Sequence, residues 1–476
     1  MAGSSHNMAW EVARRMREAL IAAAMVAALG CVAAWRTVTV HGQVAVKNQG
    51  FIPYSDAPIN YRGQDLDDPV ARLEKRLEAG TAHLEWNDKG GYLQSLLREL
   101  KIPVSSQTLV FSKTSFQYKR ISPEAPRALY FNDDVYVGFV KNGRVLEAVS
   151  FDPLKGAIFY LMDAQRRDKP LFERAELDCT QCHIAPGTRN VPGVLVRSIY
   201  PTATGTQAEY TVANVTGQES PLSERWGGWY VTGTHGSQRH MGNVTVTDEE
   251  HPEKLNTAAG ANVTSLKGRF DDSTYLSDES DIVAHLVLAH QTQMHNLITE
   301  ESFETRIALY DSEHKDADNA AAQAEAKAKY RRTAEELVRY LLFTNETRLD
   351  GPVRGTSAFA KDFASLGPND RKGRSLRDFD LRTRIFRYPC SYLIYSADWD
   401  AMPGQAKSYI YQRLYEVLTG KDQSADFARL GHEERKAILE ILLETKPDLP
   451  AEWRQSRSEE QHAQLATKQW REAHGS

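Results

Sequence analysis

The fold is decided by the stretch RALYFNDDVYVGFVKNGRVLEAVSFDPLKGAIFYLMD, residues 127–163. Short runs of β-branched and aromatic residues alternate here with Asn-Asp, Lys-Asn-Gly and Asp-Pro, which are residues typical of tight turns. The pattern predicts consecutive strands joined by hairpins, and therefore an antiparallel sheet. A similar run at 107–117 and three runs between 194 and 236 predict further strands.

Helical sequence lies on both sides of this region. Residues 69–79 and 92–100 carry apolar side chains at helical spacing before the strands begin. From Asp281 onward the composition favours helices, with apolar residues three and four apart in 281–309 and 320–343. Because strands and helices are segregated along the chain, the sequence predicts an α+β fold with a strand-rich first half and a mainly helical second half.

The 476 residues divide into three predicted parts. Residues 1–38 form a leader, 39–275 a mixed α/β domain that bears the motif discussed below, and 276–476 a helical domain. The charges nearly balance, with 58 basic and 63 acidic side chains. Basic clusters are interleaved with Ala and Glu on helical sequence, so nothing indicates a nucleic-acid partner.

The leader has the layout of an export signal. Arg14, Arg15 and Arg17 precede an apolar run from Leu20 to Trp35 that is rich in small residues. As a helix this run would be roughly 24 Å long, short of the roughly 30 Å hydrocarbon core of a bilayer. The sequence predicts a periplasmic or otherwise extracytoplasmic protein, and the alternative is membrane attachment through an uncleaved or lipid-bearing N-terminal segment.

The chemical motif is LDCTQCHIAPG, residues 177–187, in which Cys179, Cys182 and His183 form Cys-x-x-Cys-His. With four cysteines and fourteen histidines in the chain, this pattern would arise in about one shuffled sequence in a thousand. The spacing suits covalent haem attachment, because two thiols on one turn of chain can each bond a vinyl group while the adjacent imidazole reaches the iron.

Two other interpretations of the motif stay open. A zinc site would need two further ligands, and the other cysteines are Cys31 in the leader and the distant Cys390 in an apolar run. A redox dithiol of the thioredoxin kind would open a helix after a strand, whereas Ala-Pro-Gly follows this motif almost at once.

On these five positions the chain resembles the c-type cytochromes, and in its length it is similar to large, uncharacterised bacterial proteins with a cytochrome c domain. The resemblance implies one haem c, joined through thioether bonds to Cys179 and Cys182, with His183 as the proximal iron ligand. It also implies transfer of single electrons to or from redox partner proteins. The strand-rich surroundings differ from the helical fold of the small cytochromes c.

The second axial position of the iron separates two functions. Candidate ligands lie in GTHGSQRHMGN and HLVLAHQTQMHN, namely His235, His240, Met241, His285, His290, Met294 and His295. We expect Met241, because its separation from the motif is usual for an axial methionine. A saturated, low-spin iron suits electron transfer; an open position would suit a peroxidase or oxygenase, in which His235, His240 or His290 acts as acid-base partner.

Overall fold

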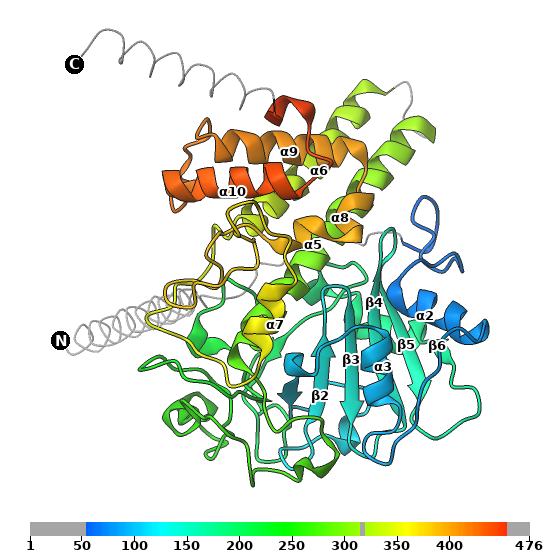
Figure 1. Ribbon diagram of the computed structural model, residues 1–476, viewed down its shortest axis with the longest axis vertical. Coiled ribbons are helices and arrows are strands. Elements are labelled where there is room, and N and C mark those ends of the chain that lie inside the picture. The colour runs from blue at the N-terminus through cyan, green and yellow to red at the C-terminus, as the bar shows by residue number, and fades with distance from the viewer. Residues whose placement is uncertain (1–53, 315–318, 455–476) are drawn as a thin grey trace, which may run out of the picture. The chain divides into compact units, whose positions relative to one another are not determined.

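A computed structural model of the chain describes residues 54–314 and 319–454 (Figure 1). The α+β class is confirmed, because the main sheet is built in the first half of the chain and most helices lie in the second. The described residues belong to one compact unit, Val44–Ser476. The predicted leader, 1–38, lies outside them. Within the described ranges, no helix has the length and apolar character that crossing a bilayer requires.

Seven strands form one antiparallel sheet in the order β6-β5-β4-β3-β2-β1-β9. Their bounds are β1 Thr108–Val110, β2 Arg127–Phe131, β3 Val135–Val140, β4 Val145–Asp152, β5 Gly156–Asp163, β6 Phe172–Arg174 and β9 Trp229–Tyr230. The predicted hairpins are confirmed, with Asn132 and Asn142 in the first two turns. The Asn132 side chain accepts hydrogen bonds from the Asp134 and Val135 amides at 3.1 and 2.9 Å.

The strands expected between 194 and 236 are much shorter than the sequence predicts. They are β7 (Arg197–Ser198), β8 (Asn214–Val215) and β9, each of two residues. Side-chain bonds replace ladder bonds in the segments between them. The Ser198 hydroxyl, for example, accepts from the Gly227 amide at 2.8 Å. This region is therefore mostly loop that is fixed by packing.

The strand register gives the sheet two faces with different partners. Cross-strand partners share a face, so Leu129, Tyr136, Val149 and Phe159 lie on one side of the sheet. The opposite side packs against α2 (Pro69–Glu78) and α3 (Leu93–Glu99), which lie in front of the sheet in Figure 1. Each face therefore belongs to its own apolar cluster.

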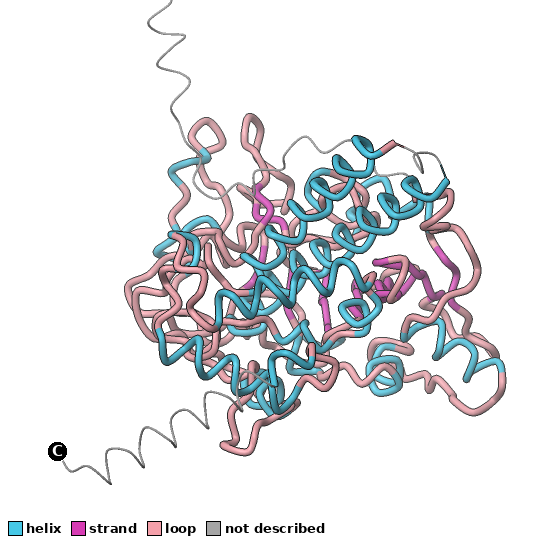
Figure 2. The backbone as a smooth tube through the Cα atoms, turned by 90° about the horizontal axis from the view of Figure 1, so that it is seen from above, coloured by secondary structure: helices cyan, strands magenta, loops and turns pink. Residues whose placement is uncertain are grey.

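The first face packs against α5 (Ile282–His314), the longest helix of the described chain. Four further helices contact α5, namely α6 Ala320–Leu341, α7 Phe359–Ser365, α8 Ala397–Ala401 and α9 Gly404–Leu418, and α10 His432–Thr445 packs against α9. Figure 2 shows a group of helices gathered beside the strands. The predicted domain boundary between 275 and 276 falls just before α5. The apolar core continues across it, since Phe159 of the sheet and Leu288 and Met294 of α5 belong to one cluster.

A fully buried carboxyl group on α5 makes the stability of this packing depend on pH. Burial raises the pKa of Glu301 to about 8, although the hydroxyls of Thr333 and Thr305 donate to its oxygens and oppose the shift. Because the folded-state pKa is raised, the neutral Glu301 carboxyl group makes its full contribution to the free energy of unfolding below the unfolded-state pKa. It is lost as the pH rises through about 8.

We predict that Glu301→Gln gains stability relative to the wild type as the pH rises from 5 to 8, and gains no more above that. The difference in free energy of unfolding between the variant and the wild type rises by up to about 1.4 kcal/mol per pH unit, because the amide cannot ionise. Urea unfolding at several pH values measures it. The control is Glu313→Gln at the exposed end of the same helix, and parallel pH profiles for wild type and Glu301→Gln would contradict the prediction.

Candidate haem-binding site

The Cys-x-x-Cys-His motif lies on a short helix, α4 (Glu176–His183), directly after β6. Residues three and four apart lie on one face of a helix, so Cys179, Cys182 and His183 point to the same side. Cys179 is partly exposed and Cys182 is exposed. All three side chains line one pocket. The local arrangement that covalent haem attachment needs is therefore present in the folded chain.

His183 is held by the loop that follows the motif. Its Nδ1 lies 2.8 Å from the carbonyl oxygen of Gly193. A carbonyl can only accept, so Nδ1 carries the proton and Nε2 presents a lone pair. Burial lowers the pKa of His183, and the bond to Gly193 only partly opposes this. The ring is therefore neutral, which is the form that ligates a metal.

The loop itself is anchored on α5. The Asn296 carboxamide accepts from the Val194 amide at 3.0 Å and donates to the Val194 carbonyl at 2.8 Å. Arg189 forms ion pairs with Glu300 of α5 and, at 2.7 Å, with Glu336 of α6. Contacts from the helical half of the chain thus position the carbonyl group that orients His183.

The pocket has a volume of about 530 Å³, within the range of pockets that hold small ligands and cofactors. Its walls come from distant parts of the chain. The apolar side chains include Leu129, Tyr136, Val149, Phe159 and Trp229 of the sheet, Leu288 of α5, and Val194 and Val196 from the loop after the motif. The Phe159 ring lies 5.0 Å from the His183 ring. A planar apolar group could lie between the sheet and α4.

Part of the pocket lining is polar and positively charged. Its charged side chains are Lys113, Arg127 and Arg197 against a single carboxylate, Glu147, an excess of two positive charges. Arg127 and Glu147 form an ion pair at 2.5 Å with side chains 19% and 13% exposed. The Arg127 guanidinium lies over Gly138, where a Cβ would come within 2.7 Å of it. This part of the lining is suited to an anionic group.

Met241 does not reach this pocket. Among the lining residues that the structure describes, His183 is the only histidine and none is a methionine. The Met241 side chain is buried elsewhere, and its sulfur accepts from the Ser198 hydroxyl at 3.8 Å. The assignment of Met241 as axial ligand stays a prediction, and it would require Met241 to move.

The histidine candidates occupy structural positions away from the pocket walls. His290 lies between Gln218 Oε1 at 2.7 Å and Ser391 Oγ at 2.8 Å, and burial lowers its pKa to about 3. Burial lowers the pKa of His240 and of His285 equally far, to about 3. His235 packs against His240 with ring centres 4.7 Å apart. Met294 is a buried core side chain.

His295 is a different case, because both its nitrogens meet acceptors. Nδ1 lies 2.8 Å from the Asp398 carboxylate and Nε2 lies 2.7 Å from the Asp133 carbonyl. Burial alone would lower the pKa of His295, yet the Asp398 carboxylate raises it above its ordinary value. This buried imidazolium holds α8 against α5 and has no lone pair for a metal.

The alternative interpretations of the motif gain no support from its surroundings. Across residues 54–314 and 319–454, no three or more His, Cys, Asp or Glu side chains are grouped so that they could hold a metal ion. The cysteines lie inside and at the end of α4, away from the helix N-terminus that lowers the thiol pKa in redox dithiols. Cys390 is buried in the apolar core, and burial raises the pKa of its thiol.

Several residues of the site carry no recognisable local signal in the sequence. Gly193, Asn296, Arg127 and Glu147 reach the pocket or support it only through the tertiary fold. Comparison with family models, curated proteins and solved structures finds no match for this chain. The assignment of the site therefore rests on its own geometry.

We predict that Gly193→Ala loosens His183, because a Cβ would lie 2.1 Å from Oδ1 of the fixed Asn296 side chain. Relief of this overlap should displace the Gly193 carbonyl and cost about 1–3 kcal/mol of unfolding free energy. Denaturant unfolding measures the loss, and the imidazole NMR signals of His183 report the tautomer. Gly404→Ala is the control, since a Cβ there meets nothing within 4 Å. Equal stability of the two variants would contradict the prediction.

Proposed function

We propose that the protein is an exported c-type haem protein that transfers single electrons through one covalently attached haem. The observation that carries this proposal is the pocket of about 530 Å³ in which the neutral His183 and both motif cysteines are brought together. Cys179 and Cys182 would form the thioether bonds, and Nε2 of His183 would be the proximal ligand.

The walls of the pocket also fit a haem group. A porphyrin is apolar over most of its area and carries two propionates at one edge. The sheet face, α5 and the loops supply apolar side chains, while the charged side chains of the lining carry an excess of two positive charges. Arg127 is fixed there by Glu147, whose second oxygen accepts from Ser115 at 2.7 Å and Gln117 at 2.8 Å. With Arg127 fixed in this way, the two negatively charged propionates of the porphyrin could bind beside it.

Bound haem supplies a reversible one-electron couple at its iron. The chain's own residues have three tasks around it. Gly193 holds the proton on Nδ1 of His183, the apolar walls exclude water, and Cys182 lies exposed at the side where a redox partner protein could approach. Thioether attachment takes place outside the cytoplasm, which agrees with the export signal expected in residues 1–38.

We predict that the wild-type chain, produced together with a cytochrome c maturation system, keeps its Soret absorption after denaturation and gains the mass of one haem. The paired change Cys179→Ala with Cys182→Ala should lose both signals, because no thioether can form. Cys390→Ala should retain them, since that thiol is buried away from the pocket. Mature wild-type protein without the added mass would refute the haem assignment.

A haem enzyme with an open second axial position is the other candidate function. It is favoured by one observation: of the described residues, the pocket walls offer no methionine and no histidine besides His183. The iron would then have a position open to an external ligand such as peroxide, and Arg127, held by Glu147, is a cationic side chain of the pocket lining.

Met241→Ala distinguishes the two candidates. We expect the absorption spectrum of the haem-loaded variant to equal that of the wild type, because Met241 lies outside the pocket. Ready binding of cyanide by the ferric wild type would favour the enzyme, and resistance to cyanide would favour electron transfer. Visible spectra with and without cyanide measure both effects. Loss of a far-red band on substitution would instead identify Met241 as the axial ligand and favour pure electron transfer.

A further inference from the structure

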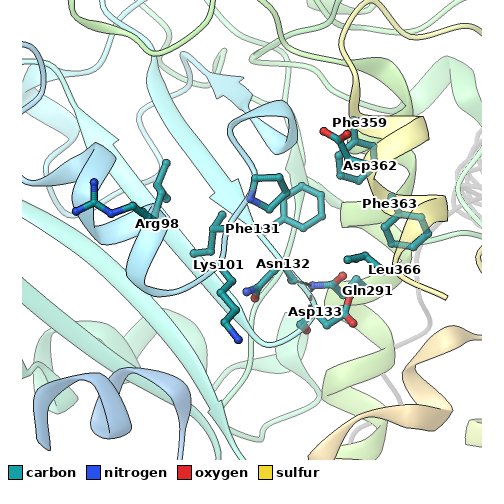
Figure 3. A pocket seen from close by; sticks show the side chains of 13 residues that line it. Arg98, Lys101, Phe131, Asn132, Asp133, Gln291, Phe359, Asp362, Phe363 and Leu366 are labelled. Atoms are coloured by element: carbon teal, nitrogen blue, oxygen red, sulfur yellow. Dashed lines mark hydrogen bonds between the residues drawn. The ribbon is translucent and has the colours of Figure 1, made fainter. Parts of the chain in front are cut away.

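A second, smaller pocket of about 250 Å³ lies beside α3 and α7, at the end of β2 (Figure 3). Most of its lining is apolar: Leu97, Ile102, Pro103, Phe131, Phe359, Phe363 and Leu366. Leu366 is 61% exposed, which is unusual for a leucine and places apolar surface at the entrance. None of these side chains belongs to the His183 pocket.

Aromatic rings form much of the wall. Phe359 lies 5.6 Å from Phe131 with the rings tilted by 50°, and 5.6 Å from Phe363 in a stacked arrangement. In Figure 3 the three rings surround the pocket, whereas the side chain of Arg98 extends away from them. Such walls favour a flat ring, which can meet their faces and edges at the same time.

The polar groups at the base of the pocket are already satisfied. Gln291 Nε2 donates to the Asn132 carbonyl at 2.7 Å and to the Tyr136 hydroxyl at 2.8 Å. The Asn132 amide group donates to the Leu100 carbonyl at 2.9 Å. A ligand therefore gains little from a polar group placed deep in the pocket.

Four charged side chains line the pocket, Arg98 and Lys101 against Asp133 and Asp362, so their formal charges cancel. Arg98 bonds Glu85 at 3.1 Å, Asp133 forms an ion pair with Arg377, and the Asp362 carboxylate accepts from the Ser105 hydroxyl at 2.7 Å. With equal numbers of positive and negative charges, the lining selects neither an anion nor a cation. The occupant that suits both the apolar wall and these charges is uncharged.

We propose that this pocket binds an uncharged aromatic molecule of one or two rings, such as a phenol or an indole. An apolar cavity of about 150 Å³ is enough to hold benzene, so a volume of about 250 Å³ leaves room for a substituent or a fused ring. The site does not depend on the haem assignment.

The position of the pocket gives such a ligand a route to influence the larger one. Phe131 stacks against Tyr136 at 6.2 Å, and Tyr136 lines the His183 pocket. Gln291 lines the smaller pocket and hydrogen-bonds the same tyrosine. The two pockets therefore share a wall made of Phe131, Tyr136 and Gln291, through which occupancy of one can affect the other.

Calorimetric titration of the purified full-length chain with phenol and with indole tests the proposal. We expect saturable binding of one molecule per chain. Leu366→Trp should fill the entrance and weaken binding at least tenfold, whereas Leu154→Trp, at a leucine that is 47% exposed and outside this pocket, should leave it unchanged. Ile102→Phe, at another lining residue, narrows the same pocket if Leu366→Trp fails to fold.

Two further probes test the chemical class of the ligand. Benzoate carries a charge on a ring of similar size, and 1-hexanol offers apolar surface without a ring; both should bind more weakly than phenol. Absence of saturable binding, equal binding by wild type and the filled variants, or tighter binding of benzoate or 1-hexanol would each overturn the proposal.

Discussion

The hydrogen bond from His183 to the Gly193 carbonyl is the constraint on which the candidate site depends. It sets the tautomer of the imidazole and leaves Nε2 as the atom with a free lone pair. The carbonyl is itself placed by Asn296 and the adjacent Val194, so α5 controls the orientation of a side chain that lies on α4. Without that support the imidazole of His183 would have no fixed orientation.

The two faces of the sheet explain why the helical half is needed. One face is closed by α2 and α3, which precede the strands in sequence. The other face would be open without α5, and α5 contributes Leu288 and Thr292 to the His183 pocket and Gln291 to the smaller pocket. The helices of the second half therefore complete both pockets. Their packing against the sheet places apolar side chains from both sides of the predicted domain boundary in one of the two clusters.

Buried histidines in this protein have structural roles, and the bonding of each ring shows the reason. His290 and His295 have partners at both ring nitrogens, so neither offers a lone pair without breaking a buried hydrogen bond. His183 differs because its side chain lines a pocket and its bond to Gly193 uses Nδ1. Counting histidines near the motif in sequence could not separate these cases, because the bonding partners of His290 and His295 are distant in the chain.

The sequence alone determined the hairpins of residues 127–163 and the segregation of strands and helices. It also singled out Cys179, Cys182 and His183 as the residues of the Cys-x-x-Cys-His motif. These features depend on turn residues, side-chain period and the spacing within one helical turn, all of which are local. Only the tertiary structure decided that Met241 lies outside the pocket and that Arg127, Glu147 and Gly193 belong to the site. Those relations follow from strand register and from the packing of α5, which bring together residues that are far apart in the chain.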